Sequence, residues 1–159
     1  GQIIEHWGYP MEKLEVVTKD GYILDIFRIR HGRNDHNVSS DCRRPSILLV
    51  HGLGSNGVQY ILNPPDQSAA FVFADGGMDV FLMNHRGTTY SKRHLTMKAT
   101  DNQFWKFTMD EFAKYDVPAV IDKIIEVTGN PSVYYLGHSQ GTLVGMMTLS
   151  ENPSYNEKV

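Results

Sequence analysis

The sequence predicts an α/β fold with a mostly parallel sheet, and three observations lead to that fold class. Short apolar runs with the composition of buried strands alternate with longer segments of helical periodicity. An antiparallel hairpin precedes this alternating series. Glycine-rich turns directly follow two of the apolar runs, at the strand ends where ligand sites of such sheets lie. With 159 residues and no linker or internal repeat, the chain predicts a single domain over residues 1–159.

The strands are predicted in chain order, beginning with the hairpin. Its two arms, residues 14–18 and 22–26, alternate apolar and polar side chains on either side of the turn residues Asp20 and Gly21. The later strands are nearly continuous apolar runs, which are typical of strands buried on both faces of a parallel sheet. These runs are residues 46–50, 79–83 and 132–136.

Three helices are expected between and after these strands. They cover residues 66–75, 108–128 and 142–149. The second helix begins with Thr108 and Glu111 at the spacing of a capping box, in which each side chain bonds the backbone N–H of the other residue. Because proline lacks an N–H, we expect Pro118 to kink this helix or to restart it, with Asp116 as a second N-cap.

Composition and charge narrow the functional classes. The formal net charge of −3 provides no basic surface, so nucleic acid is not expected as a partner. No apolar run reaches the length of a membrane span, and the first residues lack the basic and apolar regions of a signal peptide. The histidines are scattered without metal-ligand spacing, so no metal is expected. Four acids are interpreted as turn and surface residues: Asp20, Asp25, Asp35 and Asp41.

Two residues in the polar stretch 31–44 bear on the cellular compartment. Asn37 begins the N-glycosylation sequon Asn-Val-Ser, which favours a secretory route and a glycoprotein. Cys42 is the only cysteine, so these residues hold no disulfide framework from which a redox compartment could be read.

A serine lies in the turn after the third apolar run, within Gly137-His138-Ser139-Gln140-Gly141. These residues match the nucleophile-elbow pattern G-x-S-x-G at a predicted strand-to-helix junction, which is the context that the pattern requires. The sharp turn projects the serine hydroxyl beyond the sheet, and Gly137 and Gly141 let the strand and the helix approach each other closely. Ser139 is therefore the candidate nucleophile.

A second glycine turn, His51-Gly52-Leu53, follows the run 46–50, where enzymes with this elbow place the first donor of an oxyanion hole. The backbone N–H groups of Leu53 and Gln140 would there bind the alkoxide of a tetrahedral intermediate. An ordinary loop turn is the structural alternative for the His-Gly pair, and we interpret the side chain of His51 as a packing residue.

At this point the sequence resembles the acid lipases, an α/β-hydrolase family that includes gastric and lysosomal acid lipase. The runs that carry the resemblance keep their order over essentially the whole chain. They are residues 7–10 (WGYP), 18–24 (TKDGYIL), 51–53 (HGL), 84–91 (NHRGTTYS), 104–107 (FWKF), 110–119 (DEFAKYDVPA) and 137–141 (GHSQG).

The resemblance implies an α/β-hydrolase fold and hydrolysis of lipid esters, either acylglycerols or sterol esters, in acid surroundings. It implies no cofactor, peripheral contact with lipid surfaces, and a secreted or lysosomal protein. It assigns the roles given above to Ser139, Leu53 and Gln140. His85 and Tyr90 stand where the family more often has serine and tryptophan, which leaves the shape of the acyl pocket open.

A general base for Ser139 is missing from the sequence. In α/β-hydrolases the triad follows the order serine, acid, histidine, but no histidine follows Ser139 here, and we interpret the adjacent His138 as structural. We therefore expect the chain to be the N-terminal part of one hydrolase domain, truncated after the elbow and its following helix, and inactive alone. Its sheet edge beside residues 132–136 would be open, so we expect this piece to fold poorly or to associate.

Two alternative functions remain at this stage. One is a non-catalytic lipase-like protein that binds lipid, although such proteins usually lose the serine or the glycines of the elbow. The other is an esterase for small soluble esters, which would show no jump in rate when its substrate passes the solubility limit.

Overall fold

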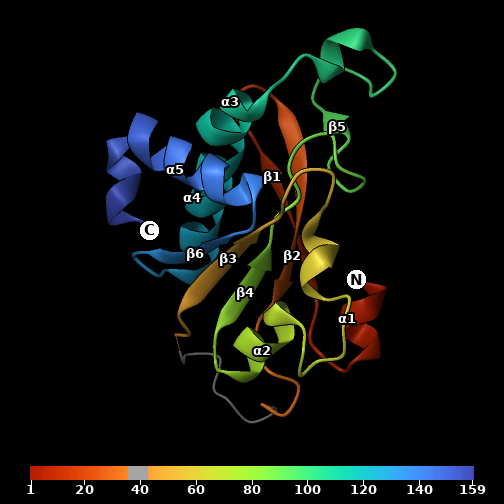
Figure 1. The fold of residues 1–159 in the computed structure, drawn as a ribbon, viewed down its shortest axis with the longest axis vertical. Helices are drawn as coiled ribbons and strands as arrows, with labels where there is room; N and C mark the ends of the chain where they lie inside the picture. Colours follow the sequence, from red (N-terminus) through yellow and green to blue (C-terminus); the bar gives the residue numbers. More distant parts are fainter. Residues whose placement is uncertain (36–42) are drawn as a thin grey trace.

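The computed structural model describes residues 1–35 and 43–159 of the chain. Within these ranges the strands form a six-stranded sheet in the order β1-β2-β4-β3-β6, with β5 paired to β2 (Figure 1). The strands are β1 (Glu12–Val17), β2 (Tyr22–Ile29), β3 (Ser46–Val50), β4 (Asp79–Leu82), β5 (Arg93–His94) and β6 (Val133–Gly137). The α-helices are α1 (Gln2–His6), α2 (Ala69–Asp75), α3 (Met109–Glu111), α4 (Val117–Thr128) and α5 (Gln140–Glu151).

The sheet combines an antiparallel and a parallel part. β3 pairs in parallel with both β4 and β6, so the three predicted apolar runs are confirmed as the parallel strands. β1 and β2 form the predicted antiparallel hairpin, and β2 also pairs antiparallel with β4. Gly21 closes the hairpin turn with φ of +97°, a conformation that glycine adopts without steric cost.

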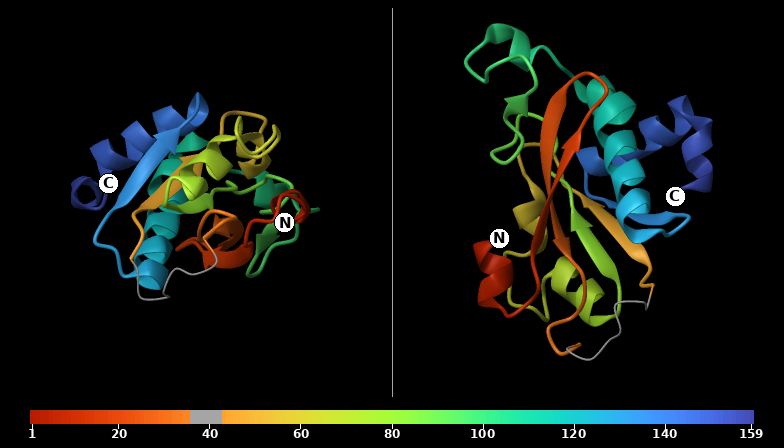
Figure 2. Two further views of the ribbon diagram at one scale, coloured as in Figure 1. Left: turned by 90° about the horizontal axis from the view of Figure 1, so that it is seen from below. Right: turned by 180° about the vertical axis from the view of Figure 1, so that it is seen from behind.

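β3 and β4 are apolar after their first residues, Ser46 and Asp79, because helices cover both faces of this part of the sheet. On one face, Leu48 and Val50 of β3 belong to an apolar cluster that includes side chains of α4 and α5. On the other face, Ile47 and Leu49 belong to a cluster that includes side chains of α1 and α2. Because successive residues of a strand point to opposite faces of the sheet, the side chains of β3 are buried on both faces. The turned views in Figure 2 show these helices on either side of the strands.

The helical segment 109–128 is continuous but contains a π-helical turn, Phe112–Asp116, between α3 and α4. The predicted capping box is confirmed, because the Thr108 N–H donates to the Glu111 carboxylate at 2.6 Å and the Thr108 hydroxyl accepts from a backbone N–H of the first turn. Pro118 lies in the first turn of α4, directly after the π-helical turn, and it has no N–H to continue the backbone bonds of a regular helix. The interruption expected at Pro118 is therefore a widened turn just before it.

The prediction of Asp116 as a second N-cap is wrong. Its backbone is helical, with φ of −69° and ψ of −57°, and its side chain makes no cap hydrogen bond. The carboxylate instead binds Arg86.

Other differences from the sequence prediction are small. α2 begins three residues later than expected, and the short helix α1, the strand β5 and three 3-10 helices were not expected. The 3-10 helices are Gly57–Tyr60, Asn102–Trp105 and Pro153–Glu157. Asn37, Asp41 and Cys42 lie outside the described residues. No helix within the described ranges combines the length and the apolar character needed to cross a bilayer.

Candidate active site

Ser139 occupies the sharp turn between β6 and α5. Its φ of 52° and ψ of −115° make it the one non-glycine residue with positive φ in the described parts of the chain. Such a conformation costs on the order of 1–3 kcal/mol and persists only where the surrounding structure enforces it. The geometry is that of the predicted nucleophile elbow.

The two glycines of the elbow are required by close backbone contacts. A Cβ on Gly137 would lie 2.5 Å from the Thr142 nitrogen, which belongs to the first turn of α5. A Cβ on Gly141 would overlap the carbonyl oxygen of Val50 at the end of β3. The helix can therefore begin directly against the sheet only because both side chains are hydrogen atoms.

The turn after β3 lies directly against the elbow at Ser139. The His138 N–H donates to the Val50 carbonyl at 3.0 Å, and an ideal Cβ on Gly52 would lie 3.3 Å from the Cβ of Ser139. Leu53, the next residue, is 80% exposed, and both Leu53 and Gln140 line the same cleft. In the structure as described, neither backbone N–H has a hydrogen-bond acceptor. Two N–H groups beside the serine are thus available to a ligand.

The cleft beside these groups has a volume of about 740 Å³ and a largely apolar wall. The apolar side chains of the wall are Leu53, Trp105, Phe107, Met109 and Phe112. The lining also includes shorter polar residues, among them Ser55, Thr88 and Thr89, together with the buried pair His51 and His85. A cleft of this size and lining suits an apolar chain attached to a polar reacting group.

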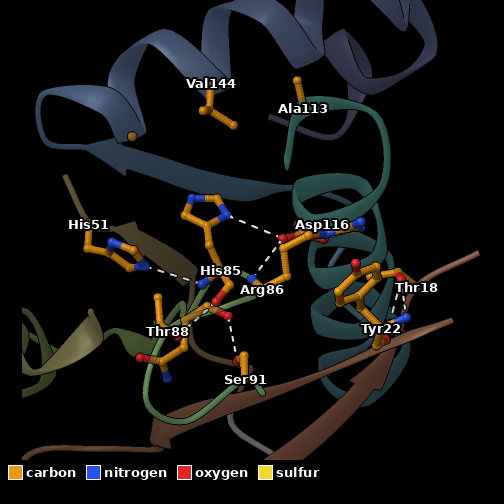
Figure 3. Close-up of polar contacts among 12 residues, drawn as sticks. Thr18, Tyr22, His51, His85, Arg86, Thr88, Ser91, Ala113, Asp116 and Val144 are labelled. Carbon is orange, nitrogen blue, oxygen red and sulfur yellow. Dashed lines mark hydrogen bonds and ion pairs between the residues drawn. The ribbon is translucent and has the colours of Figure 1, made fainter. Parts of the chain in front are cut away.

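His51 and His85 line the cleft with buried side chains, which we call its floor. Figure 3 shows the two rings beside each other. The Nδ1 atom of His51 lies 2.9 Å from the Gly52 carbonyl oxygen, and its Nε2 atom accepts the backbone N–H of His85 at 3.2 Å. Burial, and then the neighbouring His85, lower the pKa of His51 to about 4. The His85 ring stacks on Phe112 with centroids 4.5 Å apart, and its two nitrogens have no hydrogen-bond partner among the described residues.

Arg86, next to His85, is held by carboxylates from two other elements. Its Nε donates to Asp116 at 2.8 Å, and its Nη2 donates to Asp20 of the hairpin turn at 2.9 Å. Its guanidinium carbon lies 3.9 Å from the centre of the Tyr22 ring. Burial lowers the pKa of Arg86, but the bonds to Asp20 and Asp116 outweigh this effect and raise it, so the group is a permanent cation. This cluster fixes the floor of the cleft to the hairpin and to the helix.

Sequence reasoning missed this charge cluster. Asp20, Asp25 and Asp35 were expected to be turn and surface acids. Asp20 does lie in the hairpin turn, but its carboxylate binds the buried Arg86, and Asp35 pairs with Arg44 near the surface. The interpretation is wrong for Asp25, which is largely buried and pairs with Arg93. The available signal was an arginine in the turn directly after a buried strand, where an unpaired charge would be costly.

The other predicted residues occupy a mixture of places. His51 is buried, as expected of a packing residue, while His138 is exposed. Among the described residues, no histidine or carboxylate forms a hydrogen bond with the Ser139 hydroxyl, and none gather in a group that could hold a metal ion. What the described residues bring together is a serine on a strained turn, two backbone N–H groups without an acceptor and an apolar cleft.

Comparison with known proteins gives two family matches. Residues 1–64 match the model of a partial α/β-hydrolase lipase region, and residues 45–159 match that of the α/β hydrolase fold. Among solved structures, an esterase from Pyrococcus furiosus superposes with a TM-score of 0.64 at 16% identity, covering 94% of this chain and 50% of that one. An α/β hydrolase from Novosphingobium aromaticivorans superposes with a TM-score of 0.62 at 21% identity, covering 90% of this chain and 40% of that one.

Curated relatives are more similar in sequence. Human lipase member K is 47% identical over 99% of this chain and 39% of its own length. Lipase lipl-3 of Caenorhabditis elegans is 50% identical over 95% of this chain and 37% of its own length. Human gastric triacylglycerol lipase is 46% identical over 99% of this chain and 39% of its own length. The chain thus spans about two-fifths of the length of these relatives.

Proposed function

The chain belongs to the α/β-hydrolase fold family and resembles the acid lipases along its whole length, and from that premise we propose that its protein hydrolyses carboxylic esters of lipids. The observation that carries the proposal is the strained Ser139 beside two N–H groups that have no acceptor among the described residues. Strain of this kind is retained where it serves a function, here to project a hydroxyl beyond the sheet, next to residues that line the cleft. The named relatives, which include a gastric triacylglycerol lipase, support the lipid substrate.

The chemistry is acyl transfer through the serine. The Ser139 Oγ forms a bond to the ester carbonyl carbon while its proton passes to a general base, and the N–H groups of Leu53 and Gln140 bind the alkoxide. The carbonyl re-forms and expels the alcohol, which takes the proton. Water then attacks the acyl-enzyme in the same way and releases the fatty acid. We place the base, and the acid that orients it, in residues that follow Val159 in the complete protein, in the order usual for this fold.

The cleft favours esters with an apolar acyl chain, which means acylglycerols or sterol esters in this proposal. Its wall is aromatic and aliphatic, and Leu53 and Trp105 remain exposed at the site. Exposed apolar side chains around a binding cleft suit peripheral contact with a lipid surface. We further propose a secreted or lysosomal protein that carries glycan at Asn37, a position outside the described residues.

The substitution Ser139→Ala in the complete protein tests the nucleophile. We expect hydrolysis of an emulsified long-chain triacylglycerol or a cholesteryl ester to fall by about 10⁴-fold or more, because the acyl-enzyme can no longer form. Fatty acid release measured by titration at constant pH gives the rate. Ser150→Ala, at the exposed end of α5, is the matched control and should keep the wild-type rate.

Two results would count against this function. Retention of activity by Ser139→Ala would remove Ser139 as the nucleophile. A wild-type rate that does not rise when the ester passes its solubility limit would favour an esterase for small soluble esters over a lipase.

A further inference from the structure

The contacts of His51 with its neighbours give it a role beyond packing. We propose that His51 is a positioning residue, which holds the Gly52–Leu53 peptide so that the Leu53 N–H faces the reacting carbonyl oxygen, and that only its neutral ring can do so. The inference rests on the proposed esterase function, because it concerns the oxyanion hole of the same site.

The hydrogen bonds of the ring define its tautomer. The backbone N–H of His85 can only donate, so the Nε2 atom that it approaches at 3.2 Å must be an unprotonated acceptor (Figure 3). In the neutral ring the proton then lies on Nδ1, which donates to the Gly52 carbonyl oxygen at 2.9 Å. The Ser55 N–H also donates to this oxygen, at 3.2 Å. Two donors therefore hold the Gly52 carbonyl.

Fixing this carbonyl also fixes the next N–H. In a trans peptide the C=O and the N–H point in opposite directions, and the described chain contains no cis peptide. When the Gly52 carbonyl turns toward the His51 ring and the Ser55 N–H, the Leu53 N–H must point away from them. Leu53 lines the cleft together with Gln140, the second proposed donor. The buried ring thus sets the direction of a catalytic hydrogen bond without touching the substrate.

Protonation of His51 would break this arrangement. A proton on Nε2 would oppose the His85 N–H, leaving two donors face to face in a buried site. Burial and the neighbouring His85 lower the pKa of His51 to about 4, so the ring stays neutral until the pH falls to that value. Below it the fraction of correctly held oxyanion peptides decreases as the pH decreases.

The surroundings contain few other charges that could act on the ring. The Asp116 carboxylate lies 3.6 Å from the Nδ1 atom of His85, on the far side of that residue, and is itself bound to Arg86. His138 lies beside Gly52 on the exposed elbow, and Tyr60 donates its hydroxyl to the Val50 carbonyl at 2.8 Å. His85 is therefore the titratable side chain packed directly against the ring of His51, with centroids 4.9 Å apart.

Two substitutions in the complete protein separate positioning from packing. His51→Leu fills the space but removes the Nδ1 donor, so we expect kcat to fall by about 10²- to 10³-fold, as when an oxyanion donor is lost, with little change in KM. His51→Asn keeps an N–H at the Nδ1 position, so we expect it to restore kcat to within about tenfold of wild type. His31→Asn is the matched control, because the Nδ1 atom of His31 lies 2.8 Å from the Gly32 carbonyl in the same local arrangement, away from the cleft.

The pH dependence of kcat/KM also distinguishes the two roles, because a residue that only packs would not change its slope. Below pH of about 4 the wild-type log kcat/KM should fall with a slope of two, with one proton for the triad base and one for His51, whereas His51→Asn should fall with a slope of one. His85→Gln removes the neighbouring imidazole that lowers the pKa of His51 but keeps the backbone N–H, so it should move the second break to higher pH.

Several results would overturn the inference. One such result is a His51→Leu enzyme whose kcat falls only in proportion to the amount of folded protein that it loses. Another is a His51→Asn enzyme whose log kcat/KM still falls with a slope of two at low pH. Nitrogen NMR of histidine-labelled protein tests the tautomer directly, and a proton on Nε2 at neutral pH would contradict the inference whether or not the enzyme is active. Failure of the proposed function is distinct, since it appears as unchanged activity of Ser139→Ala.

Discussion

Arg86 is fully buried, and its charge is balanced from two directions. Asp116 of the π-helical turn contacts both the backbone N–H and the side chain of Arg86, and Asp20 reaches it from the hairpin turn. A buried ion pair of this kind adds little net stability compared with apolar residues of the same volume, yet breaking it leaves a buried charge without a partner. The two acids differ in burial, since the Asp116 side chain is fully buried and that of Asp20 is 26% exposed.

Removal of the buried partner should therefore be costly. We expect Asp116→Ala to reduce the free energy of unfolding by about 3–5 kcal/mol, because Arg86 would lose a partner that solvent cannot replace. Asp20→Ala should cost less, since water can reach the vacated position. Urea unfolding of the complete protein measures both values, with the exposed Asp110→Ala as the control. Equal losses for the three variants would argue against the cluster as a source of stability.

The π-helical turn explains how one helix serves both the core and the cleft. The extra residue of a π turn changes the direction in which the following side chains point. Phe112 at the beginning of the turn stacks on His85, Asp116 at its end binds Arg86, and Val117 directly after it packs in the core. The π turn thus places an aromatic ring and a carboxylate beside the floor of the cleft.

The capping box at Thr108 stabilises the beginning of this helix. Thr108→Ala removes the hydroxyl that accepts the Asp110 N–H and donates to the Glu111 carboxylate, but it keeps the backbone N–H that donates to Glu111. We therefore expect a loss of about 0.5–2 kcal/mol in the free energy of unfolding. Thermal unfolding of the complete protein should show a lower midpoint for this variant. Thr100→Ala, in an exposed turn without a cap, should leave the midpoint unchanged. An equal shift for both variants would contradict the capping role.

In the described part of the chain, the sheet ends at β6. Within the described residues β6 pairs only with β3, and its Tyr134 is 64% exposed. Leu143 and Met146 of the following helix α5 are exposed as well. An open strand edge beside exposed apolar side chains is a template for pairing with another chain.

We therefore expect the 159-residue chain, expressed alone, to associate. The open edge of β6 and the exposed face of α5 can bury apolar surface by pairing with second copies. Sedimentation velocity across a range of protein concentrations would reveal oligomers. A cooperative melt of a monomer at all concentrations would show this prediction to be wrong.

Much of this architecture could be predicted from local sequence. Continuous apolar runs predict the three parallel strands, because burial on both faces favours apolar residues at nearly every position. The Asp-Gly turn, the capping box of Thr108 and the elbow around Ser139 each depend on a few adjacent residues whose chemistry permits one conformation.

What could not be predicted depends on contacts between distant segments. Hydrophobic periodicity assumes regular helical turns and cannot reveal the extra residue of a π turn. The helix was therefore expected to restart before Pro118, with Asp116 as its N-cap. The contact between Asp20 and Arg86 spans 66 positions and exists only because β2 lies beside β4 in the sheet. The tautomer of His51 depends on the backbone of His85, which follows another strand.

The residues of the Arg86 cluster are far apart in the sequence, which determines when the cluster can form during folding. Asp20 is 66 positions and Asp116 is 30 positions from Arg86, so the three residues meet only after β2, β3 and β4 have been arranged in the sheet. Contacts over such separations must first overcome the entropy of closing long loops, and we expect this cluster to form after the main folding barrier. The interactions of the Arg86 cluster would then slow unfolding far more than they speed folding. The cluster would therefore contribute mainly to the kinetic stability of the folded protein.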